Sequence, residues 1–299
     1  MQRVLSFCIA PQNWGGEASS EIERISFRKQ RMMTTQTLDK TAFGPSQAAG
    51  NADTLDTQAL APWVQSLYRD TILQRRRDAA AHPFTQAVRA GEVDPRALAA
   101  FFGGMYWHVT RAGHLFGGFF ARRPAAVETF LEGRSEDGHS PEDETRLQKT
   151  SLGALIDALG GDSETFAQEI VDYAPPQEWF WHEAQLRSAI FSSDFPWQVG
   201  AAAINAGTEG VVPWMCGPLA DALAAGYGIN GLALEWLHQR ITPEEIEHGD
   251  NGFLILSHFV DETDAEQVSA CRLYADKLSL SMSKHLLDCG LRLHHEMSK

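Results

Sequence analysis

Hydrophobic residues recur with helical spacing along most of the chain from Leu60 onward. Apolar positions three and four residues apart are typical of amphipathic helices, and no window shows the alternation and β-branched enrichment expected of strands. Gly and Pro interrupt the pattern at intervals. We therefore predict an all-α bundle. The predicted helices cover 60–81, 83–90, 95–122, 124–136, 141–159, 163–173, 176–192, 196–225, 229–240, 243–260 and 263–289.

The N-terminal part of the chain lacks this pattern. Residues 1 to about 57 are rich in Ser, Thr, Gln, Gly and Asn and show no sustained periodicity. A segment of this kind buries too little apolar surface to fold by itself. We predict a disordered leader over 1–57 and one helical domain over 58–299. Met32 and Met33 offer an alternative start of translation.

The composition limits the class of protein. Lys and Arg number 25 against 39 Asp and Glu, and this acidic excess argues against a nucleic-acid surface. The basic run 75–77 is interpreted as the solvated end of a helix. The four cysteines have no CxxC spacing, which disfavours a disulfide framework or a zinc-thiolate site and fits a reducing cytoplasm. No apolar run approaches the roughly 20 residues of a membrane span, and residues 1–10 make a poor signal peptide. We expect a cytoplasmic protein that binds neither nucleic acid nor a membrane.

The stretch from residue 82 to residue 109 has the layout of a helical hairpin. A short helix ends at Gly91, where a left-handed cap suits glycine. Asp94 then serves as N-cap, with Pro95 in the first helical position. The helix that follows is rich in aromatic residues. It carries Tyr106, Trp107 and His108.

Glu209 stands alone in an apolar environment. It is the only acid in residues 201–214, which are otherwise mostly small or apolar. An ionised carboxylate buried there would cost several kcal/mol unless it were paired or bound to a metal. The alternative is a surface glutamate on an exposed stripe of the helix. The length of the apolar run favours the functional interpretation.

A second group of candidates lies at the start of the predicted helix 243–260. Thr242 followed by Glu245 forms a capping box, which gives Glu245 a structural role. Glu245 and His248 are also three residues apart and share a helical face, as do Glu244 and His248 four apart. A carboxylate and an imidazole on one face suit iron or manganese. His238, one helix earlier, either turns toward the same place or caps its own helix.

A third pair lies in the segment 132–143. Ser140 and Pro141 mark the N-cap and first position of a helix. An acidic interhelical loop is one interpretation of the segment. The other is that Glu136 and His139 face a pocket.

The order of these marks resembles the TenA/PqqC-like family, which has the haem-oxygenase-like helical fold. The marks are "HPF", "YWH", "EDG", "TEG", "YGI" and "EEIEHG", and they span about residues 60 to 290. The resemblance is strongest to the branch of haem-oxygenase-like diiron oxidases. It implies that the helix with Tyr106, Trp107 and His108 lines a buried pocket at the centre of the bundle.

The same resemblance implies a set of iron ligands drawn from three helices. An acidic mark with a nearby histidine looks like Glu136 with His139, and a single glutamate of the middle helix matches Glu209. A later helix carries "H-x3-D-x2-H", whose last two positions match Glu245 and His248. The first position holds Ile241 instead of histidine. The site could therefore bind one iron or two, be rebuilt around His238, or be absent.

Two other branches of the family carry different marks. The branch similar to pyrroloquinoline-quinone synthase carries "H-D-G" where this chain has "E-D-G" at 136–138, a change that favours a metal. The thiaminase branch needs a cysteine directly after the proline of the middle helix. Here Trp214 follows Pro213, and Cys216 is turned away by about 200°. Thiaminase chemistry is therefore disfavoured.

We expect a non-haem iron oxidase or oxygenase that uses dioxygen on a small polar, amino-acid-derived metabolite in a biosynthetic pathway. The metal ligands would be Glu136, His139, Glu209, His238, Glu245 and His248. Tyr106 and His108 would take part in catalysis, and Trp107 with Tyr106 would shape the substrate pocket. The alternatives are a metal-free PqqC-like oxidase, a TenA-like hydrolase, or a non-catalytic binding or regulatory protein. The oligomeric state is left open, a homodimer being one option.

Overall fold

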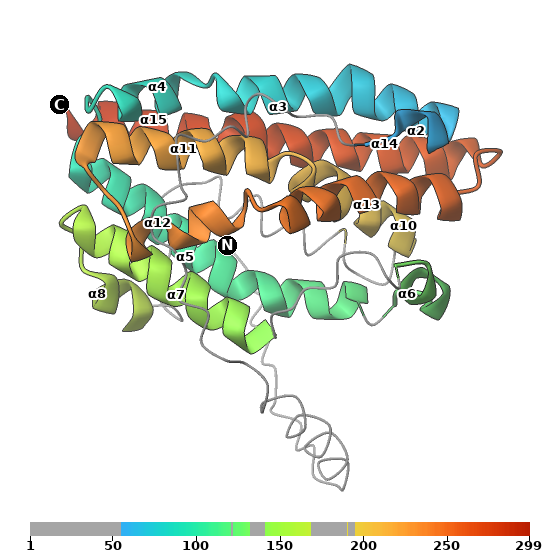
Figure 1. Cartoon of the computed structure of the whole chain (residues 1–299), viewed down its shortest axis with the longest axis horizontal. Helices are drawn as coiled ribbons and strands as arrows, with labels where there is room; N and C mark the ends of the chain where they lie inside the picture. Colours follow the sequence, from blue (N-terminus) through green and yellow to red (C-terminus); the bar gives the residue numbers. More distant parts are fainter. Residues whose placement is uncertain (1–54, 121, 132–140, 169–189, 191–194) are drawn as a thin grey trace, which may run out of the picture. The chain divides into compact units, whose positions relative to one another are not determined.

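The computed structural model describes residues 55–120, 122–131, 141–168, 190 and 195–299, and every regular element among them is helical (Figure 1). The prediction of an all-α fold is confirmed for this part of the chain. Residues 1–54 of the predicted leader, and nearly all of the predicted helix 176–192, lie outside it. No helix in the described ranges is long and apolar enough to cross a membrane.

Within 62–131 and 197–297 the helices follow one another with short connections, as the breakers predict. They are η2 (Thr57–Ala59), α2 (Pro62–Leu67), η3 (Tyr68–Ile72), α3 (Leu73–Ala80), α4 (Pro83–Arg89), α5 (Pro95–Phe120), α6 (Ala125–Leu131), α7 (Pro141–Ala158), α8 (Ser163–Gln168), α10 (Trp197–Ala201), η4 (Ala202–Glu209), α11 (Val212–Tyr227), α12 (Leu232–Gln239), α13 (Pro243–Phe259), α14 (Ala265–Leu280), η5 (Ser281–His285) and α15 (Leu286–Met297). The segments η3, η4 and η5 are π-helical. They continue neighbouring α-helices, so that α14, η5 and α15 form one long helical run.

The C-terminal helix is longer than the sequence pattern predicts. Helical structure continues to Met297, whereas the predicted helix stops at 289. Gly290 is the next residue, and glycine normally weakens a helix. Here it allows close packing, because a Cβ at this position would lie 2.5 Å from Cζ of Phe84.

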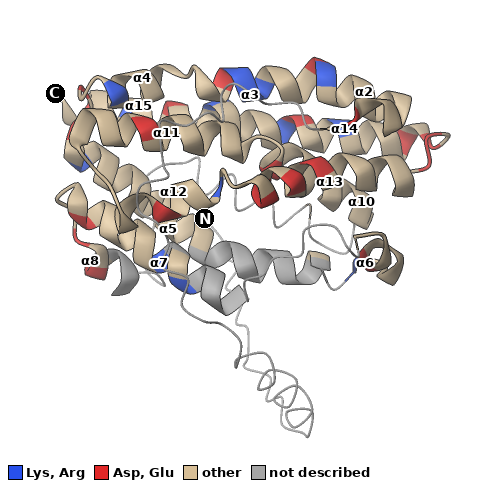
Figure 2. Ribbon diagram, in the orientation of Figure 1, with Lys and Arg blue, Asp and Glu red and all other residues tan. Residues whose placement is uncertain are grey.

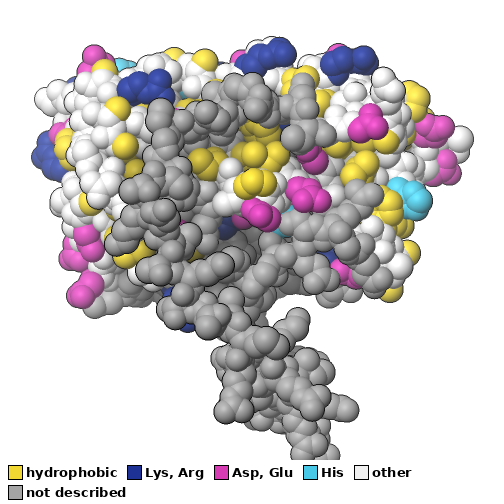
Figure 3. Space-filling view, in the orientation of Figure 1, with side chains coloured by type: hydrophobic (Ala, Val, Ile, Leu, Met, Phe, Trp, Pro, Cys, Tyr) yellow, Lys and Arg dark blue, Asp and Glu magenta, His cyan; other side chains and the backbone are white. Residues whose placement is uncertain are grey.

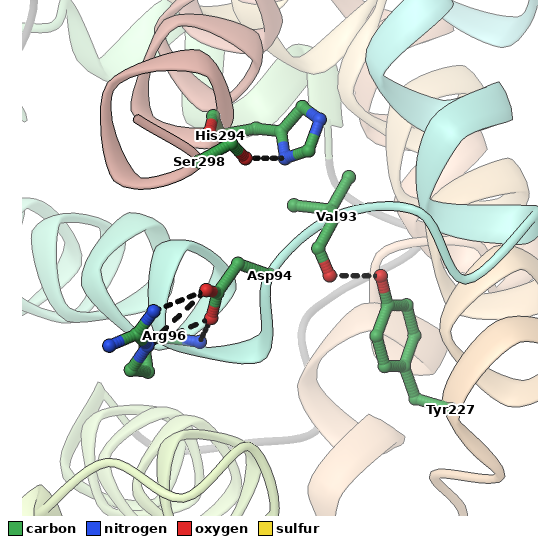
Figure 4. A network of polar contacts seen from close by, with 6 residues as sticks. All are labelled: Val93, Asp94, Arg96, Tyr227, His294 and Ser298. Atoms are coloured by element: carbon green, nitrogen blue, oxygen red, sulfur yellow. Dashed lines mark hydrogen bonds and ion pairs between the residues drawn. The ribbon is translucent and has the colours of Figure 1, made fainter.

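The predicted hairpin between α4 and α5 is confirmed. Gly91 adopts a left-handed conformation, with φ of 69°. Asp94 caps α5 by accepting a hydrogen bond from the backbone N–H of Arg96 at 2.8 Å (Figure 4). Hydrogen bonds from the Arg96 side chain hold the pKa of Asp94 at about 2. The Tyr227 hydroxyl donates to the carbonyl of Val93 at 2.6 Å and so ties this turn to the end of α11.

Helix packing sets the positions of the candidate residues. The middle of the bundle is built where η4 packs against both α13 and α14, and where α11 packs against α3 and α4. On the other side α5 packs against α7 and α15, and α7 also packs against α12. In Figure 1, α3 and α4 lie along one long side of the bundle, while α5 and α7 lie toward the opposite side.

The start of α4 depends on an uncharged histidine. His82 is buried, and its Nδ1 accepts the backbone N–H of Phe84 at 3.2 Å. Its Nε2 lies 3.2 Å from Oδ1 of Asp288, which also pairs with Lys284. Burial lowers the pKa of His82, and this effect outweighs the attraction of Asp288. Protonation of Nδ1 would also remove the acceptor that caps the helix.

We predict that this histidine makes the fold sensitive to mild acid. Because the folded pKa lies below the unfolded value of 6.5, the contribution is full above that pH and is lost as the pH falls through it. Melting temperatures of the wild type and His82→Asn, from about pH 7.5 to about pH 5.5, check this. The wild type should lose more stability than the variant, which keeps a capping side chain but cannot titrate. Equal losses in the two proteins would contradict the assignment.

Candidate functional site

Glu209 is the last residue of the π-helical segment η4. Its neighbour Gly210 donates its N–H to the carbonyl of Asn205 at 3.0 Å, the five-residue step of a π-helix. Such segments are rare in proteins and are frequently found at functional sites. They cost stability because their hydrogen bonds are less regular than those of an α-helix. The unusual backbone therefore draws attention to the same residue that the apolar pattern singles out.

The Glu209 carboxylate is half-buried and already has a hydrogen-bond donor. Nδ2 of Asn205 donates to Oε2 of Glu209 at 2.7 Å. A fully buried carboxylate would need a cation to offset its charge. Partial exposure and an amide donor reduce that cost. The need for a metal at Glu209 is therefore weaker than the sequence suggests.

The segment η4 crosses α13 at unusually short range. A Cβ at Gly252 would lie 2.6 Å from Cβ of Asn205, and a Cβ at Gly249 would lie 3.0 Å from the carbonyl oxygen of Glu209. Only glycine permits this contact between backbones. Glu245 lies one turn before Gly249 on the same face of α13. The crossing thus brings the backbone of Glu209 to within about one helical turn of Glu245.

Glu245 lies between a guanidinium group and an imidazole. Nη1 of Arg240 is 2.9 Å from Oε1 of Glu245, and Nδ1 of His248 is 4.0 Å from Oε2. The three side chains keep 16, 22 and 19% of their surface exposed, in the order Arg240, Glu245, His248. They are thus mostly enclosed and still accessible to solvent.

The first turn of α13 therefore combines a helix cap with an ion pair. Half of the predicted capping box is present, because Thr242 accepts the N–H of Glu245 at 3.4 Å. The carboxylate itself pairs with Arg240. Figure 2 shows the acidic residues at the start of α13, and Figure 3 shows acidic side chains at the molecular surface over this helix, beside hydrophobic ones.

A buried thiol lies close to this ion pair. Cys216 of α11 has no exposed surface, and burial raises the pKa of its thiol to about 12. The charges of Arg240 and Glu245 act on the same thiol, in opposite directions. A thiol with this pKa is almost entirely protonated at neutral pH and is a poor nucleophile.

The aromatic residues of the predicted pocket lie in the middle of α5. Tyr106, Trp107 and His108 are all buried, and burial raises the pKa of Tyr106. His238 lies in the last turn of α12 and is partly buried. These four residues thus lie on α5 and α12, whereas Glu245 and His248 lie on α13. Glu136 and His139 lie outside the described residues.

The described donors do not by themselves fit an iron site. Within these residues, no three His, Cys, Asp or Glu side chains are placed to hold a metal ion. Arg240 already supplies the positive charge that Glu245 needs, and Ile241 offers no donor atom. The helix crossing brings the backbones of Glu209 and Glu245 together, but a three-ligand cluster of their side chains is not seen. The iron site stays a prediction.

Sequence reasoning missed Arg76. The interpretation of 75–77 as a solvated helix end is wrong for this residue, which is only 3% exposed. Its Nε donates to the carbonyl of Gly210 at 2.7 Å, and its guanidinium lies 3.6 Å from the ring centroid of Trp214. Arg76 continues the four-residue spacing of Tyr68 and Ile72, so the buried stripe was visible in the sequence.

Comparison with known proteins supports the fold. No protein-family model and no curated protein sequence matches this chain. A solved structure of a TenA homolog from Pseudomonas syringae pv. tomato str. DC3000 is similar, with a TM-score of 0.58 and 13% identity. The match covers 84% of this chain and 99% of that one. The similarity establishes the haem-oxygenase-like helical bundle that the motif order indicates.

We predict that Cys216 is chemically inert in the folded protein. Iodoacetamide at about pH 8 should leave it unlabelled, because a buried thiol with a raised pKa forms almost no thiolate. Mass spectrometry of the peptide that contains Cys216 measures the labelled fraction. Denatured protein serves as the control and should be labelled fully. Rapid labelling of the native protein would instead indicate an activated thiol.

Proposed function

We propose that this protein is an enzyme that transfers a proton to or from a small polar metabolite, with Glu245 and His248 as the reacting pair and without a metal. The observation that carries the proposal is the enclosed but accessible Glu245 carboxylate, with Arg240 on one oxygen and His248 beside the other. A carboxylate and an imidazole so arranged are suited to general acid–base catalysis.

Each group has a separate part in the proposed reaction. Arg240 fixes Oε1 of Glu245 by a charge-assisted hydrogen bond. Oε2 is the oxygen that faces His248, so a proton taken from the substrate by one group can be returned by the other. Glu209, across the η4–α13 crossing, would bind a polar group of the substrate. Tyr106, Trp107 and His108 would form the apolar side of the pocket.

The position of Cys216 supports acid–base chemistry over covalent catalysis. The thiol is buried and protonated, which disfavours a TenA-like hydrolase that uses this cysteine as its nucleophile. A metal-free oxidase of the PqqC type remains within the proposal, because it also begins with proton removal and then uses dioxygen. A binding protein without catalysis would keep the pocket but would show no turnover.

An iron-dependent oxidase is a second candidate function. The observation that favours it is the π-helical segment that ends at Glu209 and packs on α13 beside Glu245 and His248. Two carboxylates and an imidazole are ligands that iron accepts. Glu136 and His139 would have to complete the site.

We predict that turnover depends on Glu245 and His248. The wild type is incubated in air with a metabolite extract of cells, and it should consume at least one small polar compound. Untargeted mass spectrometry measures the loss of that compound. Glu245→Gln and His248→Gln should slow this about 100-fold or more, because loss of a general acid or base commonly costs that much.

Glu247→Gln is the matched control, since Glu247 lies on the same turn of α13 but is exposed. It should leave turnover unchanged. Full turnover in Glu245→Gln would refute the assigned role. A wild type that consumes nothing but binds a compound would indicate a binding protein.

Iron content separates the two candidate functions. After anaerobic loading with Fe(II) and desalting, the acid–base proposal predicts well under one iron per chain by elemental analysis. The oxidase predicts one or two irons, lost in Glu209→Ala, reduced in His248→Ala and unchanged in Cys216→Ala. Circular dichroism of each variant shows whether the helical fold persists. Stoichiometric iron that is lost on Glu209→Ala would overturn the metal-free proposal.

A further inference from the structure

Arg76 connects four separate elements of the bundle. It belongs to α3, and its Nε donates to Gly210, which directly follows η4. Its Nη1 donates to the hydroxyl of Tyr68 in η3 at 3.0 Å, and its Nη2 lies 3.6 Å from Oδ1 of Asp250 in α13. The plane of the guanidinium faces the ring of Trp214 in α11. One buried cation thus links α3 to η3, η4, α11 and α13.

The contacts of Arg76 fall next to the proposed reacting groups. Gly210 is the residue after Glu209, and Asp250 is the second residue after His248. The peptide that carries Glu209 and the turn that carries His248 are therefore held by the same guanidinium. A shift of either helix relative to the other would stretch one of these contacts.

A role in stability alone does not explain this choice of residue. Burial of a charged pair is seldom more stabilising than apolar residues of the same volume. What arginine adds is a rigid fork of donors with fixed directions. Here Nε donates a hydrogen bond to the Gly210 carbonyl, and Nη2 meets the Asp250 carboxylate as an ion pair at 3.6 Å, which is longer than a hydrogen bond. The two contacts restrain η4 relative to α13, and catalysis requires its reacting groups to be well placed.

We propose that Arg76 is a positioning residue, which sets the distance between Glu209 on η4 and His248 on α13 by holding the Gly210 carbonyl and the Asp250 carboxylate at once. The inference rests on the proposed function of that site. It assigns to α3 a part in the site although α3 contributes no reacting group.

The test separates positioning from stability with four variants. Arg76→Gln removes both the fork and the positive charge that faces Asp250. Arg76→Gln combined with Asp250→Asn removes both charges, so much of the lost stability should return. Arg76→Lys keeps the charge without the fork. Arg75→Lys is the matched control, because the adjacent Arg75 is partly exposed and pairs with Asp276 instead.

Three measurements are made on each variant: the melting temperature, the rate of consumption of the compound found with the wild type, and hydrogen exchange of the peptide over 204–212. We expect the double variant to recover most of its melting temperature while turnover stays about 10- to 100-fold low and exchange stays fast. Arg76→Lys should also show low turnover and fast exchange. Arg75→Lys should match the wild type in all three measurements.

The contrary outcome is equally clear. If turnover and exchange recover together with the melting temperature in the double variant, Arg76 is structural only and the inference is wrong. If the wild type shows no turnover at all, the proposed function fails instead. Hydrogen exchange then decides the inference by itself: persistent fast exchange at 204–212 in the restabilised variant supports it, and normal exchange overturns it.

Discussion

The buried guanidinium of Arg76 is the interaction on which the site-bearing part of the bundle depends. It lies among Tyr68, Trp214, Gly210 and Asp250, and through them it joins α3 to η3, η4, α11 and α13. Removal of one partner of a buried ion pair commonly costs about 3–5 kcal/mol, because the other charge remains buried and uncompensated. That is a large part of the stability of an ordinary domain. The residue therefore constrains both the fold and the relation between its helices.

The proposed chemistry depends on how closely two helices approach. Gly249 and Gly252 allow α13 to contact the backbone of η4, and this contact brings Glu209 to the side of the helix that bears Glu245. Arg240, from the connection between α12 and α13, then pairs with Glu245. A charge that the sequence pattern assigns to a metal is thus balanced, at Glu245, by a side chain of the protein itself. The proposal of proton transfer rests on this arrangement.

The sequence predicts some parts of this account well and others poorly, for physical reasons. Helix periodicity and caps such as Gly91 and Asp94 depend on local interactions, so the bundle and the α4–α5 hairpin are predictable. The ion pair of Arg240 with Glu245 depends on the angle between α12 and α13, which no local pattern encodes. The burial of Arg76 was not predicted, because its charge suggested an exposed residue. Its four-residue spacing from Ile72 nevertheless places it on a buried stripe. The π-helical segments depend on tertiary packing and have no signature in the periodicity.

The most direct test of the central claim, that Arg240 and not a metal balances the Glu245 carboxylate, is an anomalous diffraction experiment at the iron absorption edge. Crystals would be grown anaerobically in the presence of Fe(II). The account predicts no anomalous peak at the η4–α13 crossing and a guanidinium still in contact with Glu245. An iron peak with Glu209, Glu245 and His248 as ligands, and with Arg240 displaced, would contradict it.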